Sequence, residues 1–161
     1  AGLLVHAVEA SLFAAPTLNG YKRYKSFQLA PDRANWGRDN KGAMVRAVGG
    51  AGDPATRLEN RAAEGAANPY LHLAAQLWAG LEGIDATRDP GPPSDTPYGC
   101  DALMLPTNLM DAVSALDSSQ LFRKRFGSQF IDYLVRIKRA EIARFLSEVT
   151  DWEQREYFDI F

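Results

Sequence analysis

The chain has 161 residues, of which 46% are hydrophobic and 24% charged, and its formal net charge is −2. This composition is typical of one globular domain, and the slightly negative charge argues against a general surface for nucleic acid or acidic lipid. No apolar run approaches the roughly 18 residues of a membrane span, and a single cysteine, Cys100, excludes an internal disulfide. We therefore expect a cytoplasmic protein with neither a nucleic-acid nor a membrane partner.

The first 40 residues predict a helix followed by a long loop. Apolar residues recur at helical spacing over residues 2–14, and Pro16 ends that helix. Residues 17–40 carry turn signals and no clear period, and a loop of this length is usually functional in a compact domain. The chain starts at Ala1 rather than methionine, and residues 2–7 are typical of the middle of a longer chain, so we expect a C-terminal portion of a longer protein.

A β-hairpin is predicted after this loop. Residues 43–48 and 55–61 have strand character, and the glycine-rich segment 49–54 between them predicts a turn. Two strands do not form a stable sheet by themselves. We therefore expect upstream sequence or a neighbouring subunit to complete the sheet.

A strong helix start follows at Asn68 and Pro69, with asparagine as the N-cap and proline in the first helical position. We expect this helix to run to about Leu81 and Gly83 to close it. Its residues are apolar on nearly all sides, which predicts a buried helix.

The remaining residues predict a surface loop over 85–101 and then further helices. A helix is expected over residues 107–116, a long one from a Ser128 cap to about Val149, and a short one from Asp151 to the terminal Phe161. The long helix has a stripe that we expect to be buried: Ile131, Leu134, Ile142, Phe145 and Val149. Together the elements predict an α+β fold with one β-hairpin and about five helices.

The clearest chemical pattern is formed by Arg57, Glu59 and Arg61, which alternate along the second predicted strand. Alternate residues of a strand point to one face, so these side chains should line one surface while Leu58 turns to the other. A carboxylate is a ligand for Mg²⁺ or Mn²⁺, and guanidinium groups bind carboxylate and phosphate oxygens. Solvated surface charges and ion pairs are the alternative interpretation.

A series of motifs in a fixed order resembles the C-terminal part of the glutamine synthetase catalytic domain. The resemblance is clear over residues 2–84 and weaker beyond them. The motifs that carry it are Asn19-Gly20-Tyr21-Lys22-Arg23, Ala30-Pro31, Trp36-Gly37-Arg38-Asp39-Asn40-Lys41, Arg46, Arg57-Leu58-Glu59-Asn60-Arg61, Asn68-Pro69-Tyr70-Leu71 and Ala79-Gly80-Leu81-Glu82-Gly83-Ile84.

This resemblance implies an ATP-dependent ligase that requires Mg²⁺ or Mn²⁺. Such enzymes phosphorylate the γ-carboxylate of glutamate and then let ammonia or an amine displace the phosphate. By position, Arg23 and Arg61 would be catalytic residues that hold the glutamate carboxylate and the acyl-phosphate. Arg46 and Arg57 would contact the nucleotide phosphates, and Glu59 would bind the metal ion.

Two positions depart from the family pattern. Lys41 stands where the family usually has arginine, and it is predicted as a catalytic and phosphate-binding residue that lacks the bidentate fork. Leu29 stands where glutamine synthetases usually have a glutamate that shields the acyl-phosphate and takes a proton from ammonium. Leucine accepts no proton, so the pattern favours related ligases that use organic amines, such as polyamines, alkylamines or anilines. Alternatively, Leu29 is an ordinary loop residue and Asp32 or another group does this work.

The resemblance also divides the chain into an active-site half, residues 1–84, and a helical part, residues 85–161. The family's other metal ligands lie upstream, and His6 and His72 are interpreted as structural. We therefore expect this chain alone to be inactive and the full-length protein to form a ring-shaped homo-oligomer. The competing hypothesis is a non-catalytic homologue that serves as an assembly or anion-binding module.

Overall fold

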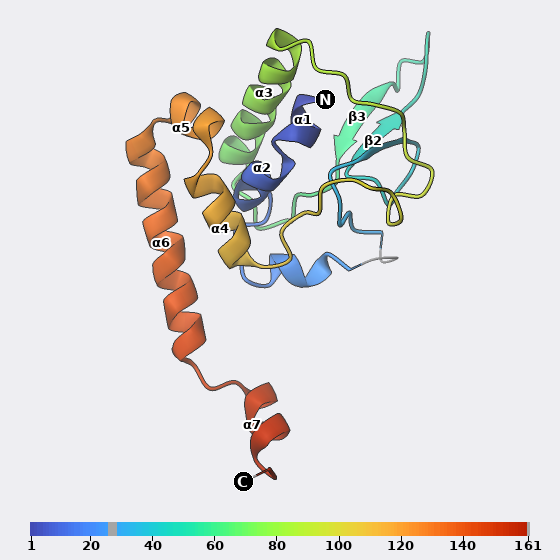
Figure 1. Cartoon of the computed structure of the whole chain (residues 1–161). Helices are drawn as coiled ribbons and strands as arrows, with labels where there is room; N and C mark the ends of the chain where they lie inside the picture. Colours follow the sequence, from blue (N-terminus) through green and yellow to red (C-terminus); the bar gives the residue numbers. More distant parts are fainter. Residues whose placement is uncertain (26–28, 161) are drawn as a thin grey trace.

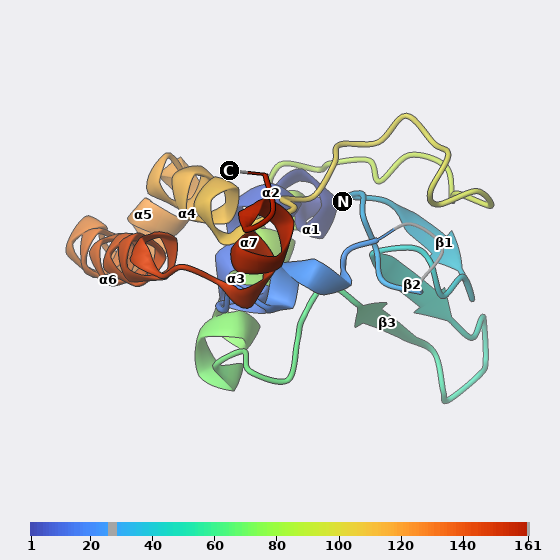
Figure 2. The ribbon, with the colours of Figure 1, turned by 90° about the horizontal axis from the view of Figure 1, so that it is seen from below.

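The computed structural model describes residues 1–25 and 29–160 and has the α+β fold that the sequence predicts. A small sheet lies on one side of the molecule and a helical layer on the other (Figures 1 and 2). In chain order the elements are α1 (Gly2–Val5), α2 (Ala7–Ala14), a 3₁₀ helix (Gly20–Arg23), β1 (Trp36–Arg38), β2 (Val45–Val48), β3 (Arg57–Asn60), α3 (Pro69–Asp85), α4 (Leu109–Asp117), α5 (Gln120–Phe126), α6 (Ser128–Ser147) and α7 (Asp151–Tyr157).

The predicted hairpin is confirmed, because β2 and β3 pair antiparallel with Arg46 directly opposite Glu59. The prediction that residues 17–40 lack regular structure is wrong, because this segment contains the 3₁₀ helix and β1. Strand β1 pairs parallel with β2, so the sheet has the order β1-β2-β3. Three residues are too few to show an alternating pattern in the sequence, which explains why β1 escaped prediction.

The first predicted helix is interrupted at His6, where α1 ends and α2 begins. Helix α1 packs on α3 through two glycines that allow the backbones to approach closely. A Cβ atom on Gly83 would lie 2.4 Å from the backbone nitrogen of Gly2, and one on Gly2 would lie 1.9 Å from the carbonyl oxygen of Ala79. The prediction that Gly83 closes α3 is therefore wrong, since this glycine lies inside the helix at a packing contact.

Helix α3 begins as predicted, with the Asn68 side chain accepting hydrogen bonds from the backbone N–H groups of Tyr70 and Leu71. Its predicted burial is wrong. Only small residues of the helix are buried, whereas the side chains of Leu73 and Leu77 are 59% and 66% exposed. An apolar helix surface predicts a partner, and within this chain the large side chains of α3 are only partly covered.

The main hydrophobic core joins α2, α4, α5 and α6. Its largest fully buried members are Leu12, Leu109, Leu116, Phe122 and Ile131. A smaller cluster under the sheet contains Met44, Val45, Ala62 and Leu105. The main core therefore holds the helical layer together, and the smaller cluster lies under the sheet.

Helix α5 was not predicted, because it is short and mostly polar. The Ser119 hydroxyl caps it by accepting from the backbone N–H of Phe122, whose side chain is fully buried. Ser128 makes no side-chain cap, contrary to prediction, and Gly127 precedes α6 with φ +89° instead. Glycine adopts this left-handed conformation without steric cost, so it allows the sharp α5–α6 turn.

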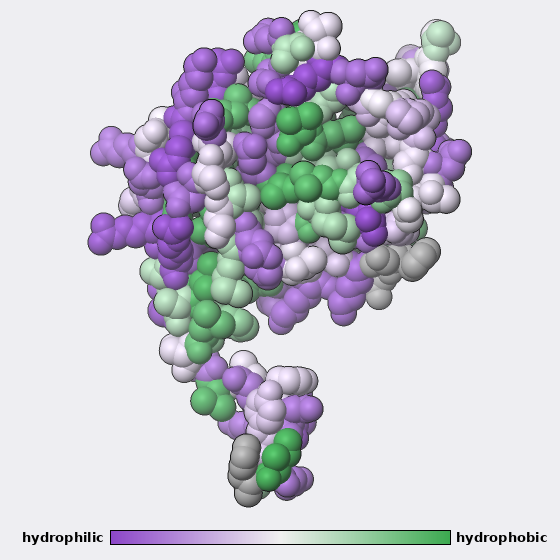
Figure 3. Space-filling view, viewed as in Figure 1, coloured by the Kyte–Doolittle hydropathy of each residue, from purple (hydrophilic) through white to green (hydrophobic). Residues whose placement is uncertain are grey.

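The C-terminal end of the chain extends beyond the core (Figure 1). Ile131 and Ile142 of the predicted α6 stripe are buried, but Phe145 and Val149 are exposed because the helix outruns the body of the protein. The predicted terminal helix is confirmed as α7, which a Thr150–Glu153 capping box begins. Hydrophobic side chains gather along the end of α6 and on α7 (Figure 3), and Phe161 lies outside the described residues. None of the described helices has the length and apolarity needed to cross a bilayer.

His6 links the two halves of the first helical segment to α3 and α5. Its ring nitrogens face Glu9 at 3.4 Å and Glu82 at 3.0 Å, and the residue is 8% exposed. Glu9 also accepts from the Ser119 hydroxyl, and Glu82 accepts from Arg88 at 2.6 and 2.8 Å. Because a carboxylate faces each ring nitrogen, both nitrogens donate only when the imidazole is protonated.

The electrostatics of this cluster follow from these contacts. The hydrogen bond to Glu9 raises the pKa of His6 against the opposing effect of burial, and Glu82 adds to the increase. Arg88, and then His6, lower the pKa of Glu82 to about 2. The pKa of His72, which lies on α3, shifts in the opposite direction, because burial lowers it.

These directions predict how the free energy of unfolding depends on pH. The His6 contribution is complete below its ordinary pKa of 6.5 and is lost as pH rises through its higher folded value. The Glu82 contribution is present above 4.5 and is lost as pH falls toward about 2. We expect His6→Gln to remove the loss of stability above pH 6.5, measured by urea unfolding over a pH series.

His72→Gln is the matched control, because a lowered histidine pKa costs stability as pH falls below 6.5. It should flatten the acid side of the profile and leave the alkaline side unchanged. An alkaline loss that persists in His6→Gln would contradict the role of this cluster.

Candidate active site

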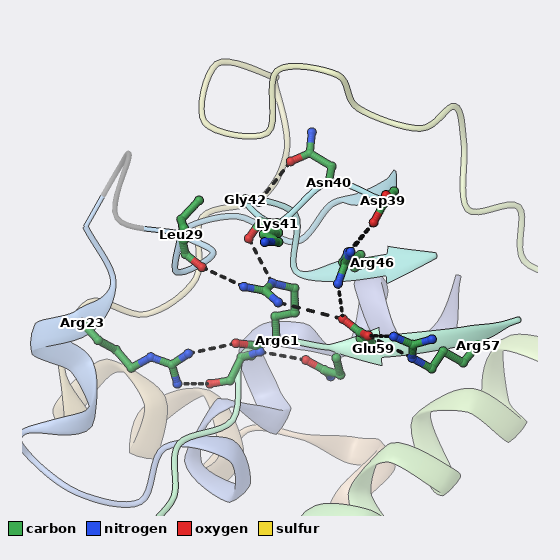
Figure 4. Close-up of polar contacts among 12 residues, drawn as sticks. Arg23, Leu29, Asp39, Asn40, Lys41, Gly42, Arg46, Arg57, Glu59 and Arg61 are labelled. Carbon is green, nitrogen blue, oxygen red and sulfur yellow. Dashed lines mark hydrogen bonds and ion pairs between the residues drawn. The ribbon is translucent and has the colours of Figure 1, made fainter. Parts of the chain in front are cut away.

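Strand β3 places Arg57 and Glu59 on one face, and Arg61 follows directly after the strand (Figure 4). Arg57 donates to Oε1 of Glu59 through Nε at 2.9 Å and Nη2 at 2.6 Å. Nη1 of Arg61 lies 3.9 Å from Oε2 of the same carboxylate, while Leu58 turns to the other face and is exposed. The predicted one-face arrangement of these three residues is confirmed.

Arg46 completes the cluster from the neighbouring strand. Its Nη1 donates to Oε2 of Glu59 at 3.0 Å across the β2–β3 pair. Arg57, and then Arg46, lower the pKa of Glu59, which favours its charged form further. Three guanidinium groups thus surround one carboxylate, and with the negative charge of Asp39 on Arg46 included, the site keeps a net positive charge that can attract anions.

Asp39 and Asn40 are site residues that the sequence reasoning did not assign. Asp39 accepts from Nε of Arg46 at 2.9 Å and raises the pKa of that arginine, with Glu59 adding to the effect. Asn40 accepts from the backbone N–H of Gly42 at 3.0 Å, which shapes the turn that carries Lys41. The Asp-Asn pair was visible as a turn signal, but its contacts depend on β1 lying beside β2.

Arg61 joins three segments of the site. Its Nε donates to the carbonyl oxygen of Lys41 at 2.9 Å, and its Nη2 donates to that of Leu29 at 3.1 Å (Figure 4). Leu29 has φ +58°, and its side chain is 58% exposed. The turn at Lys41 and the loop at Leu29 are therefore held at fixed positions relative to β3, while the Lys41 residue itself is exposed.

Arg23 lies beside this group but faces the backbone. Its guanidinium donates to three consecutive carbonyl oxygens, those of Arg61 at 3.0 Å, Ala62 at 3.2 Å and Ala63 at 2.6 Å. These bonds hold the segment that leaves β3. Contact of Arg23 with the glutamate carboxylate remains a prediction, because its donors in this structure are used by the protein backbone.

The predicted metal site contains one carboxylate, that of Glu59. Over residues 1–25 and 29–160, no three histidine, cysteine, aspartate or glutamate side chains form a cluster that could hold a metal ion. Both oxygens of Glu59 are engaged by arginines, and His6 belongs to the separate contact with Glu9 and Glu82. Glu59 therefore supplies at most one ligand of a divalent ion, after an arginine releases one of its oxygens, and the described part of the chain does not provide a complete site.

The fold and the site define a segment of an α+β catalytic domain with an arginine-rich anion site. A sequence model described as "Glutamine synthetase, catalytic domain" matches residues 1–157. The chain therefore belongs to the glutamine synthetase family and corresponds to a C-terminal portion of its catalytic domain.

Relatives with assigned names extend this comparison. The chain is 48% identical to a gamma-glutamylanilide synthase of Acinetobacter sp. and 37% identical to gamma-glutamylethanolamide synthetase GlnA4 of Streptomyces coelicolor. Each match covers 99% of this chain and 34% of the relative. A solved GmaS/ADP complex matches with a TM-score of 0.84 and 37% identity, over 98% of this chain and 38% of that one. The chain thus spans about a third of the length of the relatives it matches.

The backbone contacts of Arg23 predict its effect on stability. Arg23→Gln should lower the free energy of unfolding by about 2 kcal/mol, because it removes charged donors from three carbonyl groups. Lys22→Gln removes the same charge from an exposed neighbour and should leave stability nearly unchanged. Equal urea midpoints for the two variants would contradict this structural role.

Proposed function

We propose that this chain is the C-terminal part of an ATP-dependent ligase that joins the γ-carboxyl group of glutamate to an organic amine. The observation that carries the proposal is the cluster of Arg46, Arg57 and Arg61 around Glu59 on two paired strands. Fixed cations in this arrangement suit a reaction in which negative charge moves between a carboxylate and phosphate groups.

The residues of this cluster divide into two groups in the proposed reaction. Arg46 and Arg57 contact the phosphates of ATP, and Lys41 supplies a further positive charge from the adjacent turn. Arg61 and Arg23 hold the glutamate carboxylate and the acyl-phosphate. Because Arg61 already joins the Leu29 loop to β3, its position couples the substrate end of the site to the phosphate end.

The proposed reaction has two steps. A γ-carboxylate oxygen of glutamate attacks the γ-phosphorus of ATP, and the bond to the bridging oxygen breaks to release ADP. The amine nitrogen then attacks the γ-carbonyl carbon of γ-glutamyl phosphate, phosphate leaves, and the nitrogen releases one proton. The arginines stabilise the charge that collects on the transferred phosphoryl group and on the leaving phosphate.

ATP and a divalent cation are part of this proposal. The structural relative was solved as a complex with ADP, which supports a nucleotide site in the same fold. Glu59 would bind Mg²⁺ or Mn²⁺ together with ligands from outside the described residues. When bound, this ion supplies charge neutralisation and Lewis-acid polarisation of phosphate oxygens.

The choice of an organic amine over ammonia rests on Leu29. Its exposed apolar side chain offers neither a carboxylate to attract ammonium nor a proton acceptor. Two named relatives make an anilide and an ethanolamide of glutamate, which supports an organic amine as the acceptor. Ammonia remains the second candidate for the acceptor.

The exposed surface of α3 supports the proposal that this chain is one part of a larger catalytic domain. Leu73, Leu77 and the β3 residue Leu58 are all exposed, and β3 pairs with a strand on one side only among the described strands. Additional strands packed here would bury these leucines and complete the site. We therefore propose that residues 1–161 alone are inactive and that the full-length cytoplasmic protein forms a ring-shaped homo-oligomer.

Replacing Glu59 tests the site. Glu59→Gln keeps the side-chain volume but removes the charge that binds the metal ion and orients the arginines. In the full-length protein, glutamate- and amine-dependent ADP release should fall by about two to three orders of magnitude. Glu141→Gln removes a carboxylate that pairs with Lys138 on α6 and should leave this rate unchanged. Unchanged activity of Glu59→Gln would remove Glu59 from the site.

Replacing Leu29 tests the acceptor. We expect the full-length protein to use isopropylamine, spermidine or aniline with a higher kcat/KM than ammonium. Leu29→Glu should shift the ratio toward ammonium by about tenfold, because it introduces a proton acceptor and a negative charge. If ammonium is the best substrate of the unmodified protein, the organic-amine proposal is wrong.

A further inference from the structure

Tyr98 lies in the segment between α3 and α4 and packs directly on the site turn. A Cβ atom added to Gly42 would lie 2.9 Å from Cε2 and 3.1 Å from Cζ of the Tyr98 ring, and 2.7 Å from Cγ of Pro97. The ring therefore rests against the backbone immediately after Lys41. Only glycine leaves room for this contact, so the turn and the ring are matched in shape.

Side chains of the β1 region hold this segment in place. The buried Asn35 donates to the carbonyl oxygen of Pro97 at 2.7 Å, and its own Oδ1 accepts from the backbone N–H of Met44 at 3.2 Å. Farther along, Trp36 Nε1 donates to the carbonyl oxygen of Gly91 at 3.0 Å, and Asn40 donates to that of Ser94 at 3.3 Å. A surface loop with no periodicity in its sequence is thus fixed to the site at several points.

The hydroxyl end of Tyr98 reaches the other side of the site. Burial raises the pKa of Tyr98, and a hydrogen bond from the Leu29 backbone lowers it. The charge of Asp32 also raises this pKa, and that of Arg61 lowers it. The ring thus extends from Gly42 toward Leu29. These are the two segments that Arg61 joins through the carbonyl groups of Lys41 and Leu29.

We propose that Tyr98 is a specificity-determining residue that, together with Leu29, contacts the organic substituent of the amine acceptor. This inference rests on the proposed ligase function. An aromatic ring and a leucine side chain offer apolar surface to an alkyl or aryl group, whereas ammonium has no apolar part that could use it. A hollow of about 430 Å³, lined by residues 95–99, lies along the same segment as the ring.

The test is an amine series assayed with Tyr98→Ala, Tyr98→Leu and Tyr98→Phe in the full-length protein. At saturating glutamate and ATP, Tyr98→Ala should lower kcat/KM for aniline and isopropylamine by about tenfold relative to ammonium. Because the ring also packs beside the Lys41 turn, the KM values for glutamate and ATP are measured in each variant, and the change in the aniline-to-ammonium ratio should exceed any change in these values. Tyr98→Phe keeps the ring and should keep the order of amines.

A purely structural role gives a different result. If Tyr98 only supports the loop, Tyr98→Ala lowers kcat/KM for all amines by the same factor, and this outcome overturns the inference. Tyr98→Leu keeps apolar bulk against Gly42, so it decides the question if the alanine variant does not fold: an aniline-to-ammonium ratio equal to that of the unmodified protein contradicts a role for the ring.

Tyr133→Ala is the matched control, since this tyrosine is exposed on α6, which lies on the opposite side of the molecule from the sheet (Figure 1), and the variant should leave every ratio unchanged. If the unmodified protein shows no amine-dependent ADP release, the proposed function itself fails, and this inference fails with it. A uniform loss confined to the Tyr98 variants refutes only the role of Tyr98.

Discussion

The pairing of Arg46 with Glu59 across β2 and β3 is the interaction on which the rest of the site depends. Arg57 and Arg61 approach the same carboxylate, so without it three like charges would share one face of a small sheet. Glu59 reduces this repulsion and orients the guanidinium groups, and these arginines in turn lower its pKa. Glu59 and Asp39 together supply two negative charges against three arginines, which leaves one net positive charge to attract a polyanionic ligand.

Around this pairing, arginines also organise the backbone. Arg61 holds the carbonyl groups of Lys41 and Leu29, and Arg23 holds those that follow β3. Loops that would otherwise be free to move are thereby fixed against the sheet. The same guanidinium groups are the predicted substrate contacts, so substrate binding and local stability are coupled in this part of the chain.

Close contacts at glycine residues join segments that are far apart in the chain. Gly2 and Gly83 let α1 approach α3, and Gly42 accommodates the Tyr98 ring. Where glycine brings elements together, His6 adds a charged contact between them with Glu9 and Glu82. Leu73 and Leu77 of α3 and the end of α6 remain exposed. This exposure is consistent with a chain that spans about a third of the length of its relatives.

The sequence by itself determined the α+β class, the β2–β3 hairpin, the Asn68 cap and the one-face set of Arg57, Glu59 and Arg61, because these features follow from local spacing. It did not predict β1, α5 or the exposure of α3, since a three-residue strand has no measurable period and burial depends on what packs alongside. Only the tertiary structure brought Asp39 to Arg46, turned Arg23 toward backbone carbonyls and placed Tyr98 on Gly42. Each of these contacts joins segments far apart in the chain or depends on strand pairing. Local sequence patterns carry no information about which distant segments come into contact.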